Sequence, residues 1–166
     1  MFYERVFRAL NRARVRYLVV GGVAVALHGS DRLTADLDIM VDMGEENLTR
    51  LVAALARLGF RPVVPVKIED FVSAENRRRW QREKGMLVFG LTNVKNPLMS
   101  VDIMLDNPVD FKSAYLRRVV ARIEDLRIPL AGSADLIRMK MESSRVQDLD
   151  DIAFLKAADR ARRSGR

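Results

Sequence analysis

Hydrophobic and polar positions along the chain follow two different periods, and each change of period marks a new element. Apolar residues recur at helical spacing over residues 2–13 and 45–58, whereas residues 36–42 alternate acidic and apolar positions as a strand with one buried face does. The same reading along the chain predicts helices at 2–13, 23–27, 45–58, 68–82, 133–142 and 146–161 and strands at 17–20, 37–41, 61–66, 86–91, 99–105, 119–123 and 126–130.

The order of these elements indicates the fold class. Helices and strands mix at the start, several strands follow, and two helices end the chain. This order predicts an α/β (α+β) fold with a mixed β-sheet flanked by helices. We expect a single domain over residues 1–166, in which residues 133–161 form a C-terminal helical extension, because no repeat or low-complexity linker divides the chain. Pro62 and Pro65 place the segment 61–66 at a sheet edge.

Composition narrows the possible chemistry. Of the 166 residues, 49% are hydrophobic, enough for one sizeable core, and the absence of cysteine excludes disulfide frameworks, cysteine-ligated zinc and thiol nucleophiles. Lys and Arg total 29 against 22 Asp and Glu, a formal charge of +7 that favours polyanionic partners such as nucleic acid or nucleotide phosphates.

The longest apolar run, residues 17–27, is shorter than the roughly 20 residues that cross a bilayer. With no secretory signal visible, we expect no membrane contact and a cytoplasmic location.

Carboxylates on two predicted strands form the strongest chemical signal. Asp36 and Asp38 lie two residues apart on one strand, so their side chains point the same way and repel each other unless a cation lies between them. Asp102 stands between apolar residues of a later strand. If the two strands pair, the three carboxylates make a cluster of the kind that binds Mg²⁺ (or Mn²⁺) and phosphates. Asp102 would then lie nearest an incoming hydroxyl and could act as its base.

A pair of glycines precedes these carboxylates. Gly21 and Gly22 follow a predicted strand and open a predicted helix, where bare backbone lets N–H groups approach a phosphate. Two glycines alone are weak evidence. Their position before an Asp-x-Asp strand and a third Asp on another strand makes a nucleotide site the better interpretation.

The motif as a whole resembles a known superfamily. Residues 21–29, GGVAVALHG, and the following Arg32-x-Thr34-x-Asp36-x-Asp38 resemble the DNA polymerase β-type nucleotidyltransferases. Within that superfamily they are similar to small prokaryotic members, namely minimal nucleotidyltransferases and the nucleotidyltransferase toxins of abortive-infection systems. Residues 136–151 look like the C-terminal helical motif of those members. The resemblance spans residues 17 to about 155, although residues 61–99 contribute no motif.

The resemblance implies an enzyme that moves a nucleoside monophosphate from a triphosphate such as ATP to an acceptor hydroxyl or amine and releases pyrophosphate. It implies that Asp36, Asp38 and Asp102 are the catalytic and metal-binding carboxylates. Many members carry Gly-Ser where this chain has a second glycine, so a hydroxyl contact to phosphate is absent here. The residues assigned to the nucleotide are Gly21, Gly22, Arg32, Thr34 and Lys140.

Several alternatives stay open at this level. The acceptor is tRNA, a partner protein or a small molecule, including an aminoglycoside or lincosamide, and the chain could belong to a toxin–antitoxin pair. A catalytically silent nucleotide-binding or toxin–antitoxin partner module is a second hypothesis. A third is RNA binding through the basic run 77–84, with Trp80 stacking on a base. His28 either touches the nucleotide or serves as a structural cap, and the oligomeric state has no signature.

Overall fold

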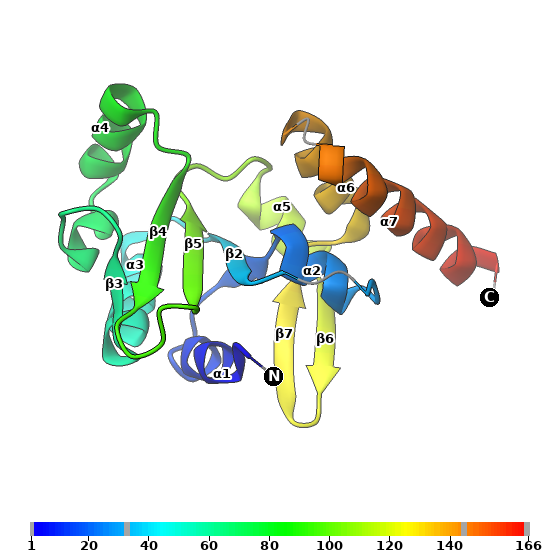
Figure 1. Ribbon diagram of the computed structural model, residues 1–166, viewed down its shortest axis with the longest axis horizontal. Helices are drawn as coiled ribbons and strands as arrows, with labels where there is room; N and C mark the ends of the chain where they lie inside the picture. Colours follow the sequence, from blue (N-terminus) through cyan, green and yellow to red (C-terminus); the bar gives the residue numbers. More distant parts are fainter. Residues whose placement is uncertain (1, 32–33, 144–145, 165–166) are drawn as a thin grey trace.

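The strands form one mixed sheet. The structure, a computed structural model, describes residues 2–31, 34–143 and 146–164. In this part of the chain seven strands lie in the order β3-β4-β5-β2-β1-β7-β6 (Figure 1). The pairs β2–β5 and β1–β7 are parallel, and the other neighbours are antiparallel. The strands are β1 Tyr17–Val19, β2 Asp36–Val41, β3 Phe60–Pro62, β4 Val88–Asn93, β5 Ser100–Met104, β6 Val119–Ile123 and β7 Leu126–Leu130.

Helices lie on both faces of this sheet, and two further helices form the C-terminal end of the chain. In Figure 1, α2 crosses in front of the strands, α3 lies behind them, and α6 and α7 form a pair that ends the chain. The predicted fold class is therefore confirmed. The helices are α1 Glu4–Arg12, α2 Gly21–Leu27, α3 Glu45–Arg57, the 3-10 helix η1 Ile68–Val72, α4 Ala74–Lys84, α5 Phe111–Leu116, α6 Ser133–Ser143 and α7 Val146–Ser164.

The alternation of β2 and β5 separates a core face from a polar face. Leu37 pairs with Val101, Ile39 pairs with Ile103, and these four side chains are fully buried. The residues between them point to the other face. None of the helices in the described residues is long and apolar enough to cross a membrane.

The segment predicted as one helix over 68–82 is two elements. The 3-10 helix η1 ends at Val72. The hydroxyl of the next residue, Ser73, caps α4 by accepting a hydrogen bond of 3.3 Å from the backbone N–H of Asn76. Phe71 in η1 is fully buried, and its ring stacks on Phe89 of the sheet with 5.0 Å between centroids.

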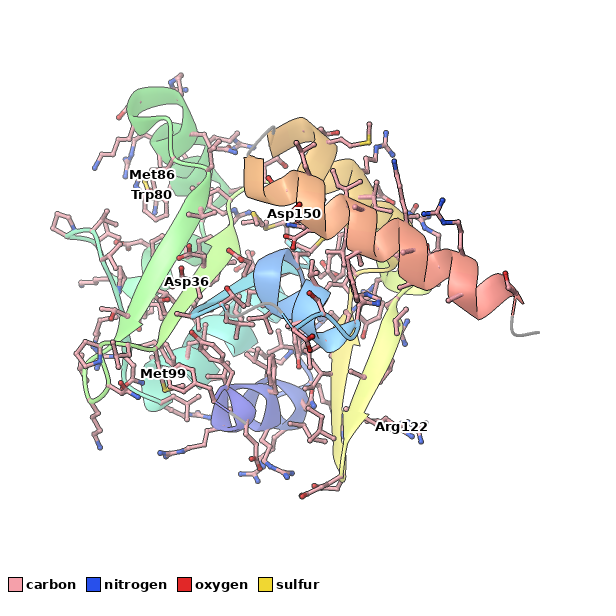
Figure 2. All side chains as sticks on the ribbon, turned by 45° about the vertical axis from the view of Figure 1, so that its right-hand side comes forward. Asp36, Trp80, Met86, Met99, Arg122 and Asp150 are labelled. Atoms are coloured by element: carbon pink, nitrogen blue, oxygen red, sulfur yellow. The ribbon has the colours of Figure 1, made fainter. Side chains whose placement is uncertain are left out.

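Burial of Trp80 contradicts the stacking part of the RNA-binding hypothesis. Trp80 is only 3% exposed and stacks on Phe89 with 5.3 Å between centroids (Figure 2). Arg77 is also buried, and it donates hydrogen bonds to the carbonyl oxygens of Phe71 and Val72. The basic run therefore divides into a structural face and an exposed face, and the exposed face has no aromatic side chain to receive a base.

Candidate functional site

The three predicted carboxylates lie on one face of two neighbouring strands. Asp38 on β2 is the register partner of Asp102 on β5, and Asp36 is the partner of Ser100. Asp36 is exposed, whereas Asp38 and Asp102 are half-buried (Figure 2, with Asp36 labelled). The two strands do pair, which is the condition that the carboxylate cluster required. It brings together carboxylates that lie far apart in the sequence.

Hydrogen bonding and packing turn these carboxylates in different directions. The Oδ1 atom of Asp36 accepts a hydrogen bond of 2.5 Å from the hydroxyl of Ser100, and the carboxylate of Asp38 lies against Gly21. As the side chains stand, no three acidic or imidazole groups in the described part of the chain converge closely enough to hold a metal ion. A shared ion therefore requires at least one carboxylate to rotate about its side-chain torsions.

Gly21, in the turn after β1, lies against the side chain of Asp38. Its φ of +63° is a conformation that favours glycine, and a Cβ there would lie 2.0 Å from Oδ2 and 2.9 Å from Cβ of Asp38. The backbone N–H of Val20 donates to the carbonyl oxygen of Asp38 at 2.9 Å, which holds the turn against β2. The absent side chain thus leaves the space that the carboxylate of Asp38 occupies.

The environment of Asp102 raises the pKa of its carboxyl group. Burial raises the pKa of Asp102 above its ordinary value, and the negative charge of Asp36 raises this pKa further. A Cβ on Gly90 of β4 would lie 3.3 Å from Oδ1 of Asp102, so the absence of a side chain there makes room for the carboxylate. Sequence reasoning missed Gly90, although a glycine inside a strand signals such a close approach.

The raised pKa leads to a prediction about stability. Above its folded-state pKa, the charged carboxylate of Asp102 costs free energy in the folded protein, because the unfolded chain releases that proton more easily. We expect Asp102→Asn, measured in EDTA by thermal unfolding at neutral pH, to raise Tm. The gain should shrink as the pH falls through the raised folded-state pKa and disappear below 3.8, the ordinary aspartate value, where both states are protonated. A lower Tm for the variant at neutral pH would contradict this expectation.

Thr34, Arg32 and His28 were also considered as contacts of the nucleotide. Thr34 is half-buried in the loop just before β2, and Arg32 lies outside the described residues. His28, at the end of α2, is 7% exposed, and its Nε2 lies 3.0 Å from the carbonyl oxygen of Ala131. This contact joins α2 to the segment after β7. It favours the structural interpretation of this histidine.

Lys140 is buried between the last two helices. Its Nζ donates to Asp148 at 2.8 Å and to Asp151 at 2.6 Å, so residues of α6 and α7 are joined by a charged network. The C-terminal motif quoted in the resemblance therefore stabilises the packing of this helix pair. The contact of Lys140 with phosphate stays a prediction, and Arg145 lies outside the described residues.

Comparisons with known proteins point to one family. Residues 3–130 match the family of aminoglycoside-2''-adenylyltransferases. The fold is similar to that of the lincosamide antibiotic adenylyltransferase LnuA in its lincomycin-bound crystal structure, with a TM-score of 0.62 at 18% identity over 95% of this chain and 94% of that one. It is also similar to an antigenic nucleotidyltransferase-like protein from Paracoccidioides brasiliensis, with a TM-score of 0.57 at 17% identity over 93% and 73% of the two chains.

These findings refine the resemblance read from the motifs. No curated protein matches the chain in sequence. The family match covers most of the chain, including both carboxylate strands, and the two structural likenesses agree with its fold. None of them points to the toxin–antitoxin members that the sequence resembled. The chain belongs to the aminoglycoside-2''-adenylyltransferase family, enzymes of the polymerase β-like nucleotidyltransferase superfamily.

Proposed function

We propose that this enzyme transfers AMP from ATP to a hydroxyl group of a small antibiotic of the aminoglycoside or lincosamide class. The observation that carries the proposal is the register of β2 and β5, which places Asp38 beside Asp102 with Asp36 on the same face. The family match supports the reaction type. The fold likeness to LnuA, whose structure contains lincomycin, supports a small acceptor.

The residues present fit a divalent cation once at least one carboxylate rotates toward the others. Asp36, Asp38 and Asp102 supply hard oxygen ligands, and the effect of Asp36 on the pKa of Asp102 indicates that their negative charges reinforce one another. These three residues would hold Mg²⁺. When bound there, Mg²⁺ supplies positive charge that stabilises the triphosphate and the negative charge developing on the phosphoryl group.

Groups of the chain itself bind the triphosphate and accept the proton of the acceptor. The backbone of Gly21 and Gly22 lines the triphosphate, since neither residue carries a side chain that would keep it away. The acceptor oxygen forms a bond to the α-phosphorus of ATP, and the bond from that phosphorus to the bridging oxygen breaks as pyrophosphate leaves. The carboxylate of Asp102 takes the proton of the acceptor hydroxyl.

Local charge favours a cationic acceptor. Although the chain carries a net charge of +7, the face around Asp36, Asp38 and Asp102 is acidic. The ammonium groups of an amino sugar are attracted to such a face. The burial of Trp80 also removes the aromatic group that was expected to stack on an RNA base.

One labelling experiment tests the proposal. The protein is incubated with Mg²⁺, ATP labelled at the α-phosphate, and separate panels of aminoglycosides, lincosamides, bulk tRNA and cell protein. We expect label on at least one antibiotic, and we expect Asp36→Asn/Asp38→Asn to lower the rate by at least about 100-fold. Parallel reactions with the other triphosphates test the preference for ATP.

The same panels separate the alternatives. Label on tRNA or on a protein would replace the antibiotic acceptor with the toxin-like activity. Binding of ATP without transfer to any acceptor would favour a catalytically silent nucleotide-binding module. RNA binding that depends on the exposed arginines of α4 and is unaffected by Mg²⁺ would favour the third hypothesis.

A further inference from the structure

The side chain of Tyr3 links the N-terminal helix to the start of both carboxylate strands. We infer that Tyr3 and Ser100 are positioning residues that hold the carboxylate of Asp36 in place for the cation. This inference rests on the proposed function, in which Asp36 is a metal ligand. Neither residue is among those that the sequence motif assigns to the site.

Tyr3 contacts the backbone at two places that are distant in sequence. Its hydroxyl lies within hydrogen-bond distance of the carbonyl oxygen of Ala35 and 2.7 Å from that of Ser100, and can donate its proton to either. The same oxygen accepts a hydrogen bond of 3.2 Å from the backbone N–H of Ser100. The side chain is only 3% exposed. One buried hydroxyl thus binds the chain just before β2 and the first residue of β5.

These two contact points lie directly beside Asp36. Ala35 precedes Asp36 in the chain, and Ser100 is the register partner of Asp36 across the parallel pair. Strand ends fray when their backbone groups lack partners, so a hydroxyl bound to both ends limits the movement of this corner. The position of the Asp36 backbone therefore depends on Tyr3.

Ser100 extends this link to the carboxylate. Its hydroxyl donates to Oδ1 of Asp36 at 2.5 Å, while its backbone is bound to Tyr3. A hydrogen bond to one carboxylate oxygen restricts rotation and leaves the second oxygen for a cation.

The chain offers a matched control for the loss of a buried phenol. Tyr17 is fully buried on β1, and its hydroxyl donates to Oδ1 of Asn11 at 3.1 Å. Its register partner is Val41, at the other end of β2 from Asp36. Tyr17→Phe therefore removes one tyrosine hydroxyl from the same domain without touching the Asp36 corner.

The experiment measures binding of Mn²⁺ in the presence of ATP by electron paramagnetic resonance, so it needs no acceptor. We expect Tyr3→Phe to weaken Mn²⁺ binding by about 10-fold or more and Ser100→Ala to weaken it in the same direction. Tyr17→Phe should bind Mn²⁺ as the unaltered protein does. Thermal unfolding of each variant shows whether it is folded at the temperature of the titration.

The outcomes are distinguishable. Equal Mn²⁺ affinity in Tyr3→Phe, Tyr17→Phe and the unaltered protein would overturn the inference, even if both variants lower Tm. If Tyr3→Phe does not fold, Ser100→Ala decides, because it keeps the backbone contacts of Tyr3 and removes only the hydroxyl that reaches Asp36. An Asp36→Asn variant that retains full Mn²⁺ affinity would instead overturn the metal role of Asp36, and with it the proposed function.

Discussion

Replacing Asp38 by asparagine is expected to lower the rate of adenylyl transfer by at least about 100-fold, with a loss of Mg²⁺-dependent ATP binding. Asp38 lies at the centre of the acidic face, between Asp36 on its own strand and Asp102 on the next. An amide of the same shape keeps the packing against Gly21 but removes the charge that attracts a cation. The rate is measured with labelled ATP, and ATP binding by calorimetry with and without Mg²⁺.

Asp42→Asn is the matched control for this prediction. Asp42 follows β2 directly, at the end of the strand away from Asp36, and its carboxylate forms an ion pair of 2.7 Å with Arg16. The substitution removes one carboxylate charge near the same strand and leaves the acidic face unaltered. We expect it to retain its transfer rate. Similar losses in both variants, or a normal rate in Asp38→Asn, would contradict the assignment of Asp38.

Gly21→Ala should be nearly as damaging as loss of a carboxylate, with a fall in transfer rate of about 100-fold. The added Cβ would lie 2.0 Å from Oδ2, 2.7 Å from Cγ and 2.9 Å from Cβ of Asp38. Rotation of the carboxylate can move the first two atoms away, but not the third. Either the turn after β1 or the strand β2 must therefore shift, and the carboxylate leaves its position.

Gly85→Ala separates this collision from backbone strain. Gly85 ends α4 with a φ of +60°, close to the +63° of Gly21, and nothing lies within 4 Å of the Cβ that it would gain. Both substitutions should cost about 1 kcal/mol of unfolding free energy through the left-handed conformation. Only Gly21→Ala should also lose activity and Mg²⁺-dependent ATP binding. If the two variants behave alike, the contact with Asp38 has no role in the site.

Local patterns account for the parts of the fold that were predicted well. Strand β2 alternates acidic and apolar residues, and β5 repeats the pattern around Asp102, so the face of each carboxylate follows from the two-residue period of a strand. Gly59, with a φ of +88°, lies just after the end of α3, where a glycine commonly ends a helix. These features depend on neighbours in the chain, which a sequence displays directly.

The elements that were missed depend on contacts made elsewhere. The short helix α5, Phe111–Leu116, has too few residues to show a period. Its one local signal is Asp110, whose side chain accepts a hydrogen bond of 2.9 Å from the backbone N–H of Ser113. Trp80 looked available for a base because its neighbours in the chain are charged. Its burial follows from Phe89, which lies beyond the end of its helix.

The amino-acid sequence alone indicated the reaction class and the candidate residues. Its signals were three aspartates facing one side of two strands, a pair of glycines before them, and a resemblance that the family match made specific. The three-dimensional arrangement was needed to show that β2 and β5 are parallel neighbours although β3 and β4 lie between them in the chain. The hydrogen bonds of Tyr3 to the start of β5 and to the residue before β2 also appear only in the folded chain. The physical reason is that side-chain direction along a strand is a local property, whereas strand neighbours and buried hydrogen bonds depend on how the whole chain packs.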